Sequence, residues 1–282
     1  MKKILALILT LALALSLSAC GKAAASTPQT EGDAAPKKVL RVGMECGYAP
    51  YNWAQPSDAN GAVPIKGSSD YAYGYDVMMA KYLAEQMGYE VEIQKMEWDS
   101  LPVAVQSGTI DCVIAGQSVT AERLQTVDFT TPYYYASIVA LTKKGSPYEN
   151  AKTVADLSGA VCTSQLNTIW YTVCLPQIEK ADIKPAMESA PSMLVALESG
   201  KVDLVVTDQP TALGAVAAYP DMVPLDLSAG DFEVSEEEIN IGISVKKGNT
   251  ELLDALNAGL AKLTKDDFTK MMDEAIKLSA AL

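Results

Sequence analysis

Residues 103–116 read VAVQSGTIDCVIAG, and residues 195–208 read VALESGKVDLVVTD. The two segments align without gaps, and each combines a short helical pattern, a Ser-Gly stop, an aspartate and an apolar strand pattern. One such match is common in α/β proteins, but two that agree in this detail indicate two related α/β lobes. Ligands of open α/β sheets bind beyond the carboxyl ends of the strands. We therefore expect a cleft between the strand ends of the two lobes.

The rest of the chain supports an α/β fold. Strand patterns cover residues 39–44 and 91–96, and a helical pattern covers 75–87 and stops at Gly88. Alternating strands and helices predict βαβ units and mainly parallel sheets. Residues 250–278 again have helical spacing and should pack back on the first lobe.

Composition excludes several classes of function. The chain has 282 residues, of which 49% are hydrophobic, so it can bury a core and has the length of two lobes. Its 22 basic and 35 acidic residues give a formal charge of −13, which argues against a nucleic-acid partner. The absence of histidine excludes Ser-His-Asp and Cys-His nucleophiles and His-based zinc sites, whereas carboxylate or lysine catalysis stays open. We expect no metal and no cofactor.

The N-terminus has the pattern of an export signal. Lys2 and Lys3 precede the apolar run 4–17, which is shorter than the ~20 residues that a membrane-spanning helix needs. We predict a signal peptide over residues 1–19; a buried core helix is the alternative. Residues 17–21 (LSACG) resemble the bacterial lipobox, which makes Cys20 the lipidated first residue of the mature protein and residues 20–37 a tether. The folded part should then lie outside the cell membrane.

The remaining cysteines do not suggest a metal site. They lack CxxC spacing, and Cys162–Cys174 is the only disulfide that we consider. Cys112 lies in an apolar strand pattern and should be a small buried side chain.

Arg123 is the most informative charged residue. Thr120 resembles a helix N-cap, which places Arg123 in a first helical turn, where the helix dipole favours anions. Arg123 therefore needs an acidic neighbour or an anionic ligand. A salt bridge is one reading; the other is bidentate binding of a ligand carboxylate, a geometry that lysine cannot provide.

At this point the sequence resembles the bacterial extracellular solute-binding proteins of the polar amino acid ABC transporters (family 3), from Val39 to about Lys277. The matching motifs are LRVG (40–43), YAPY (48–51), GYDV (74–77), SGTID (107–111), TAER (120–123), DF (128–129) with PY (132–133), LSG (157–159), and SGKVD (199–203) with Asp208. The resemblance implies a two-lobed, type II periplasmic-binding-protein-like fold with two mainly parallel sheets flanked by helices and two hinge strands. It also implies a monomeric, lipid-anchored component of an ABC importer that delivers a free polar or cationic L-amino acid to permease subunits. Catalytic residues are not expected.

The resemblance also implies how the chain is divided. Residues 38–134 and 239–282 would form the first lobe, and residues 138–234 the second. The chain would cross between them near residues 134–137 and 234–238.

The resemblance assigns one end of an amino acid to Arg123. Its guanidinium would bind the α-carboxylate, helped by the hydroxyl of Thr120. From the second lobe, Thr168 would begin a helix and present main-chain N–H groups after Gln165. The family more often has glycine where this chain has Asn167, and asparagine tolerates the left-handed conformation.

The other end would be the α-ammonium. Gly116 and Ser118 would offer carbonyl or hydroxyl oxygens, and Asp208 would pair with the ammonium from the second lobe. Because Arg123 and Asp208 lie on different lobes, closure would strengthen binding.

Three aromatic residues occupy side-chain-pocket positions in the family. Tyr51 is the ring that we expect to stack on the ligand. Tyr48 and Trp98 are predicted to line the pocket, and core packing is their alternative.

Glu45 follows the first strand, where cation-preferring relatives carry an acid. It favours a cationic or strongly hydrogen-bonding side chain, such as lysine, arginine, ornithine or glutamine; a solvated loop carboxylate is the alternative. Gln117 and Gln165 would instead fit an amide or polar ligand.

Two other functions stay open. Extracellular prephenate or arogenate dehydratases resemble this fold, and Glu45 is the candidate for their general acid. The second is an amino-acid-sensing module read by a membrane receptor.

Overall fold

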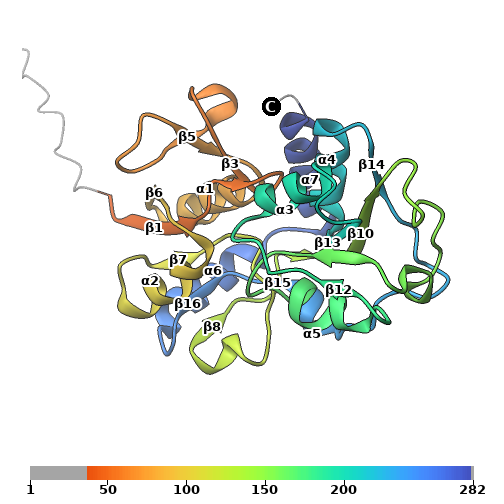
Figure 1. Cartoon of the computed structure of the whole chain (residues 1–282). Helices are drawn as coiled ribbons and strands as arrows, with labels where there is room; N and C mark the ends of the chain where they lie inside the picture. The colour runs from red at the N-terminus through yellow and green to blue at the C-terminus, as the bar shows by residue number, and fades with distance from the viewer. Residues whose placement is uncertain (1–36, 281–282) are drawn as a thin grey trace, which may run out of the picture. The chain divides into compact units, whose positions relative to one another are not determined.

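The computed structural model describes residues 37–280 (Figure 1). The predicted signal peptide, Cys20 and nearly all of the tether lie outside the described residues. Within residues 37–280, no helix combines the length and the apolar character that crossing a membrane requires.

The first sheet contains five strands, four of which run in one direction. Only β16 runs the opposite way, since it pairs antiparallel with both β7 and β8, whereas β1 pairs parallel with β6 and β7. In spatial order the strands are β6 (Glu90–Lys95), β1 (Val39–Met44), β7 (Cys112–Val113), β16 (Ser244–Lys246) and β8 (Val127–Phe129).

The second sheet repeats this plan, and β10 is its single reversed strand. In spatial order the strands are β12 (Asp182–Ile183), β11 (Val161–Thr163), β13 (Leu204–Asp208), β10 (Ile138–Lys143) and β14 (Met222–Pro224). The internal repeat supplies the same part of each sheet, because α2 (Leu101–Ser107) leads into β7 and α3 (Ala190–Glu198) leads into β13.

The aspartate of each repeat has the same structural role. The Asp111 carboxylate accepts a hydrogen bond from the Arg41 N–H on β1 (2.8 Å), and the Asp203 carboxylate accepts one from the Val161 N–H on β11 (2.9 Å). The N–H of each aspartate donates to the carbonyl of the same partner. Each aspartate thus fixes its repeat against the neighbouring parallel strand of its sheet, β1 or β11.

The helix expected over residues 75–87 forms with these bounds, whereas the helical pattern of residues 250–278 forms two helices. Helix α1 (Tyr75–Met87) ends at Gly88, whose φ of 69° ends the helix in the left-handed conformation. The C-terminal segment forms α6 (Thr250–Leu260) and α7 (Lys265–Ser279), which both pack on α1; α7 also contacts α4 (Gln209–Ala218) of the second half.

A two-stranded sheet lies where the chain is expected to cross between the lobes. Strand β9 (Tyr134–Tyr135) pairs antiparallel with β15 (Asn240–Ile241), which follows the short helix α5 (Glu236–Ile239). The first expected crossing coincides with β9, whereas β15 lies a few residues after the second. The residue boundaries of the two lobes stay a prediction.

A small antiparallel sheet in residues 47–73 was not expected. Its strands, in spatial order, are β2 (Gly47–Tyr48), β3 (Asn52–Gln55), β5 (Tyr71–Tyr73) and β4 (Val63–Pro64). The remaining short turns are η1 (Ala59–Gly61), η2 (Trp98–Ser100), η3 (Arg123–Gln125), η4 (Val154–Leu157), the π-helical η5 (Trp170–Cys174) and η6 (Leu175–Gln177).

The structure contradicts the expected helix at Thr120 and the disulfide considered between Cys162 and Cys174. The helix expected to begin at Thr120 is a single turn, η3, because strand β8 begins at Val127 and leaves no room for a longer helix. Cys162 and Cys174 do not form a disulfide; both are free and buried. Cys112 is fully buried, as predicted.

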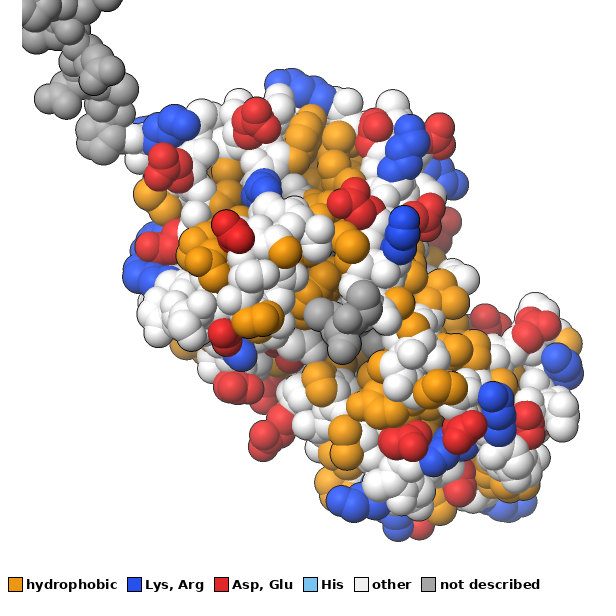
Figure 2. Space-filling model, turned by 90° about the horizontal axis from the view of Figure 1, so that it is seen from above, with side chains coloured by type: hydrophobic (Ala, Val, Ile, Leu, Met, Phe, Trp, Pro, Cys, Tyr) orange, Lys and Arg blue, Asp and Glu red, His pale blue; other side chains and the backbone are white. Residues whose placement is uncertain are grey.

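Surface charge agrees with the acidic composition. Figure 2 shows lysine and arginine side chains in small groups among acidic and apolar ones on the described part of that face. The described part of this face has no extended basic stripe of the kind that tracks a phosphate backbone.

Candidate functional site

Eight of the predicted binding residues line one small cavity, which we call the inner cavity. They are Glu45, Tyr48, Trp98, Gly116, Ser118, Arg123, Gln165 and Thr168, and Trp170 completes the lining. The inner cavity has a volume of about 10 Å³, roughly the space of one water molecule. An amino acid can enter only if these walls separate.

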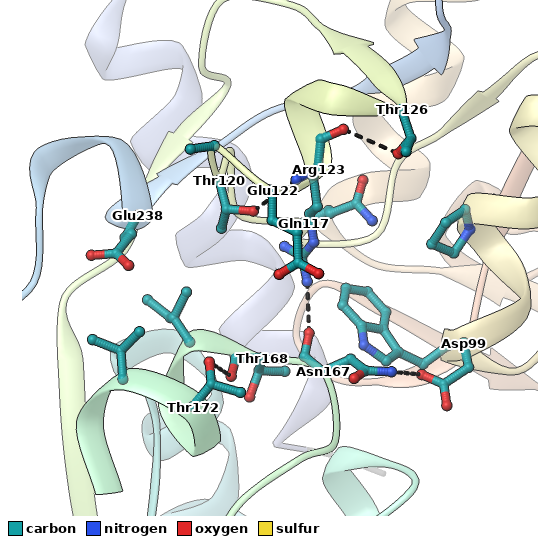
Figure 3. Close-up of a pocket in the computed structure, with 15 residues that line it drawn as sticks. Asp99, Gln117, Thr120, Glu122, Arg123, Thr126, Asn167, Thr168, Thr172 and Glu238 are labelled. Carbon is teal, nitrogen blue, oxygen red and sulfur yellow. Dashed lines mark hydrogen bonds between the residues drawn. The ribbon is translucent and has the colours of Figure 1, made fainter. Parts of the chain in front are cut away.

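Arg123 bridges segments from both halves of the molecule. Its Nη1 donates to the Ser118 carbonyl (2.8 Å) and its Nη2 to the Asn167 carbonyl (2.8 Å), as Figure 3 shows for the second bond. The guanidinium carbon lies 5.4 Å from the centre of the Trp98 ring. Thr120 accepts a hydrogen bond from the Arg123 N–H (3.2 Å), so it fixes the backbone that carries this side chain.

The described residues provide no carboxylate within ion-pair distance of Arg123, which removes the salt-bridge reading. Burial lowers the pKa of Arg123 to about 10, because desolvation disfavours the charged form. Arg123 is therefore a partly buried cation without an acidic partner among the described residues, and an anionic ligand would supply one.

Asp208 links the two halves through Tyr48. It ends β13 and caps α4, where its Oδ1 accepts from the Thr211 N–H (2.9 Å). Its Oδ2 accepts a hydrogen bond from the Tyr48 hydroxyl on β2. Asp208 is 1% exposed, and burial raises its pKa. Tyr48 thus stands between Asp208 and the inner cavity, and its hydroxyl must move before Asp208 can meet an ammonium group.

Glu45 has one carboxylate oxygen without a partner. Its Oε1 accepts from Gln165 (3.2 Å), whereas Oε2 is buried and accepts no hydrogen bond from the described residues. Burial, together with repulsion by nearby acids, raises the pKa of Glu45 to about 7. No lysine lines the inner cavity. The solvated-loop reading is therefore wrong, and Glu45 presents a buried acceptor that suits a cation.

The aromatic rings are arranged differently from the expectation. The Tyr51 ring stacks on Tyr48 with centroids 4.7 Å apart and is fully buried behind it, so Tyr48 is the ring that borders the inner cavity. The centre of the Trp170 ring lies 6.3 Å from that of Tyr48. Trp170 was not predicted as a site residue, because nothing in the sequence distinguishes it from a core tryptophan.

Gly116 is required by its surroundings. Its φ is 60°, and a Cβ there would lie 2.6 Å from Cε1 of Tyr48. A side chain at this position would push Tyr48 away from Asp208.

A second and larger cavity of about 490 Å³, the outer cavity, adjoins the inner cavity at Arg123 (Figure 3). Asp99, Glu122 and Glu238 line it, and Arg123 is the one basic residue among its described lining. Asn167 spans its wall: its Nδ2 donates to Asp99 (2.8 Å), and its φ of 55° confirms the predicted left-handed conformation.

Thr168 lies two residues before the short π-helical segment η5, which stands where a regular helix beginning at Thr168 was predicted. Its hydroxyl donates to the Gln165 carbonyl (2.7 Å) and accepts from the Tyr171 N–H (3.4 Å). Among residues 37–280, no group of three or more Cys, Asp or Glu side chains is arranged to hold a metal ion.

Comparison with known proteins identifies relatives of this arrangement. The family model of the bacterial extracellular solute-binding proteins, family 3, matches residues 40–276. The L-cystine-binding protein TcyJ of Escherichia coli (strain K12) is 28% identical over 236 residues, which cover 84% of this chain and 81% of that protein. The arginine-binding extracellular protein ArtP of Bacillus subtilis (strain 168) is 28% identical over 264 residues, which cover 93% of each.

A solved structure extends the likeness to three dimensions. The amino acid ABC transporter substrate-binding protein AbpA from Streptococcus pneumoniae Canada MDR_19A, bound to L-arginine, superposes with a TM-score of 0.72 and 27% identity. The match covers 86% of this chain and 96% of that one. The two-lobed amino-acid-binding fold is therefore confirmed.

Proposed function

The chain belongs to the bacterial extracellular solute-binding proteins, family 3, and from this premise we propose that it captures a cationic L-amino acid of the arginine class. Its relatives are amino-acid-binding proteins of ABC transporters, and the chain is the substrate-binding component of such an importer. The identity of the amino acid and the role of each residue form the proposal.

One observation carries the proposal: a partly buried arginine without an acidic partner among the described residues lines the same cavity as a buried glutamate with a free oxygen. A zwitterion with a cationic side chain supplies both missing partners. Its α-carboxylate replaces the carbonyls on Arg123, and charge-assisted hydrogen bonds of this kind contribute roughly 1.5–3 kcal/mol each.

The α-ammonium goes to Asp208, Ser118 and Gly116. Asp208 has no cation as partner among the described residues, and the Tyr48 hydroxyl is exchanged for the ligand's ammonium as the ligand enters. The Ser118 carbonyl, released by Arg123, becomes a second acceptor.

The cationic side chain goes to Glu45, beside the rings of Tyr48 and Trp98. The acids of the outer cavity add a negative field on the approach to the inner cavity, which attracts a cation. A neutral amino acid would leave the buried Glu45 carboxylate without a cationic partner.

Capture requires a change between two arrangements of the lobes. Four side-chain bonds join the halves in this structure: Arg123 to Asn167, Asn167 to Asp99, Tyr48 to Asp208, and Gln165 to Glu45. These bonds must open to admit the ligand, which then takes over the same groups as the lobes close about β9 and β15. We further propose that the protein acts as a monomer anchored by lipid on Cys20, at the outer face of the membrane, where it delivers the ligand to the permease subunits.

The decisive experiment compares L-arginine with L-citrulline by isothermal titration calorimetry. Citrulline has the same length and shape but no side-chain charge, so we expect at least tenfold weaker binding. Glu45→Gln should abolish this preference, whereas Glu90→Gln, at an exposed position on β6, should keep it. Equal affinity for the two ligands would refute cation selectivity, and the absence of binding by any amino acid would refute the function.

A dehydratase activity has one observation in its favour. The pKa of Glu45 is raised to about 7, which suits a general acid. The relatives named above are binding proteins. Incubation with prephenate and arogenate, followed by a search for phenylpyruvate or phenylalanine, separates the two functions.

A further inference from the structure

Asp76, the second residue of α1, lies outside both cavities and is fully buried. We propose that Asp76 is a positioning residue for ligand binding, because its carboxylate holds the two loops of the first sheet that carry Glu45 and Gly116. This inference rests on the proposed function and assigns it a residue that does not touch the ligand.

One chain of hydrogen bonds runs from Asp76 through Tyr133 to Gly116. The Tyr133 hydroxyl donates to Oδ1 of Asp76 (2.6 Å) and accepts from the Gly116 N–H (3.1 Å). The tyrosine is itself fully buried, and its N–H donates to the Ile241 carbonyl on β15. The position of Gly116 beside Tyr48 therefore depends on a hydroxyl oriented by Asp76.

A second chain of hydrogen bonds runs from Asp76 through Asn52 to Cys46, the residue after Glu45. The Asn52 side-chain N–H donates to Oδ2 of Asp76 (2.8 Å), and its carbonyl oxygen accepts from the Cys46 N–H (2.8 Å). Cys46 has a φ of 52°, an uncommon conformation for a residue other than glycine, so the turn after Glu45 needs this support. Asp76 also donates its own N–H to the Tyr51 carbonyl (2.8 Å).

The chemistry of the contact requires a carboxylate. Both oxygens of Asp76 act as acceptors, and an asparagine amide would present an N–H₂ to one of the two donors. Tyr75, Tyr133 and Asn52 are its uncharged neighbours. Two acids interact electrostatically with Asp76: the charge of Asp208 raises the pKa of Asp76, and the charge of Asp76 raises the pKa of Glu45. No basic partner of Asp76 is found among the described residues. An unpaired buried charge is costly for folding, so its presence beneath the binding loops favours a role in positioning them.

The first test compares two isosteric variants by calorimetric titration with L-arginine at pH 8. Tyr133→Phe removes the hydroxyl between Asp76 and Gly116, and we expect affinity to fall at least tenfold. Tyr75→Phe is the matched control: it also removes a buried hydroxyl beside Tyr133, one that donates to the Tyr133 carbonyl (2.5 Å), but it leaves the bonds of the Tyr133 hydroxyl to Asp76 and Gly116 in place. We expect its affinity to stay within about twofold of the wild type.

The second test uses the pH profile, which a purely structural role would not move. Burial raises the pKa of Asp76 to about 6, so protonation below pH 6 should weaken binding. Glu45→Gln removes the titration of Glu45 from the profile. In that background we expect Asp76→Asn to bind more weakly at pH 8 and to lose less affinity between pH 8 and pH 5.

Three results would overturn the inference: unchanged affinity in Tyr133→Phe, an equal loss in Tyr75→Phe, or parallel pH profiles with and without Asp76. Failure of the wild type to bind any amino acid would instead refute the proposed function.

Discussion

Arg123 illustrates what a single residue can reveal. Its position after Thr120 predicted a need for an anion, and the structure confirms that the described residues provide none. The predicted helix was wrong, but the physical argument survives, because the burial of the guanidinium, not a helix dipole, creates the need.

We expect Arg123→Ala to weaken binding of L-arginine at least a hundredfold, because the ligand carboxylate loses a bidentate partner. Arg123→Lys should recover only part of the affinity, since an ammonium group lacks the fork of donors. Titration calorimetry measures both, with circular dichroism to confirm folding. Wild-type affinity in the alanine variant would contradict the assignment.

Glu45 should make binding depend on pH. Because the pKa of Glu45 is about 7 in the free protein, its carboxyl group becomes protonated as the pH drops from 8 to 6. A protonated Glu45 must lose its proton before it can pair with a cation, so affinity for arginine should fall over this range. Glu45→Gln should flatten this slope. A slope that persists in the variant would assign the dependence to another group.

The raised pKa of Glu45 also predicts that the stability of the free protein falls with rising pH, whereas the affinity for arginine rises. Because the pKa of Glu45 is higher in the folded than in the unfolded state, the folded state binds more protons, and stability should fall as the pH rises from about 4.5 to 7. Glu45→Gln should therefore raise the melting temperature of the free protein at pH 8 by a few degrees. Differential scanning calorimetry at pH 5 and pH 8 checks this; an equal shift at both would exclude the titration.

At the scale of elements, the internal repeat predicted the fold well. Both copies form a helix, a glycine stop and a strand, and the copies occupy equivalent places in two sheets of the same strand order. The small sheet of residues 47–73 was not predictable, since its strands have two to four residues and show no usable alternation. The π-helical segment after Thr168 was missed because its pattern resembles an ordinary helix.

Gly116 offers an element-level test with a matched control. Gly116→Ala places a Cβ against Tyr48, and we expect a loss of about 1–3 kcal/mol in the free energy of unfolding together with weaker ligand binding. Gly108→Ala has a similar φ of 79° but meets no atom within 4 Å, so it should show the backbone cost alone, with normal binding. Chemical denaturation and calorimetry separate the two effects, and equal behaviour of the variants would exclude the steric contact.

At the scale of the whole molecule, sequence reasoning identified most of the site but not its internal contacts. Eight predicted residues meet in the inner cavity, because strand ends of a repeated plan converge. The bond between Tyr48 and Asp208 joins residues 160 positions apart, and no local pattern can reveal such a pair. The network around Asp76 was missed for the same reason.

The bonds between the halves should govern the rate of capture. Tyr48→Phe removes the hydroxyl that donates to Asp208, so we expect opening to become easier and association with arginine to become several-fold faster. Trp98 and Trp170 line the inner cavity and provide an intrinsic signal for stopped-flow fluorescence. An association rate equal to that of the wild type would show that this bond does not limit opening.

The placement of β16 has a consequence for biosynthesis. This strand comes from residues 244–246 yet sits between β7 and β8, both completed before residue 130. Until that late segment is available for folding, β7 and β8 lack the strand that pairs with both, and the first half of the polypeptide cannot close its sheet. The binding loops that this sheet carries should therefore reach their final positions only when nearly the whole chain has been synthesised.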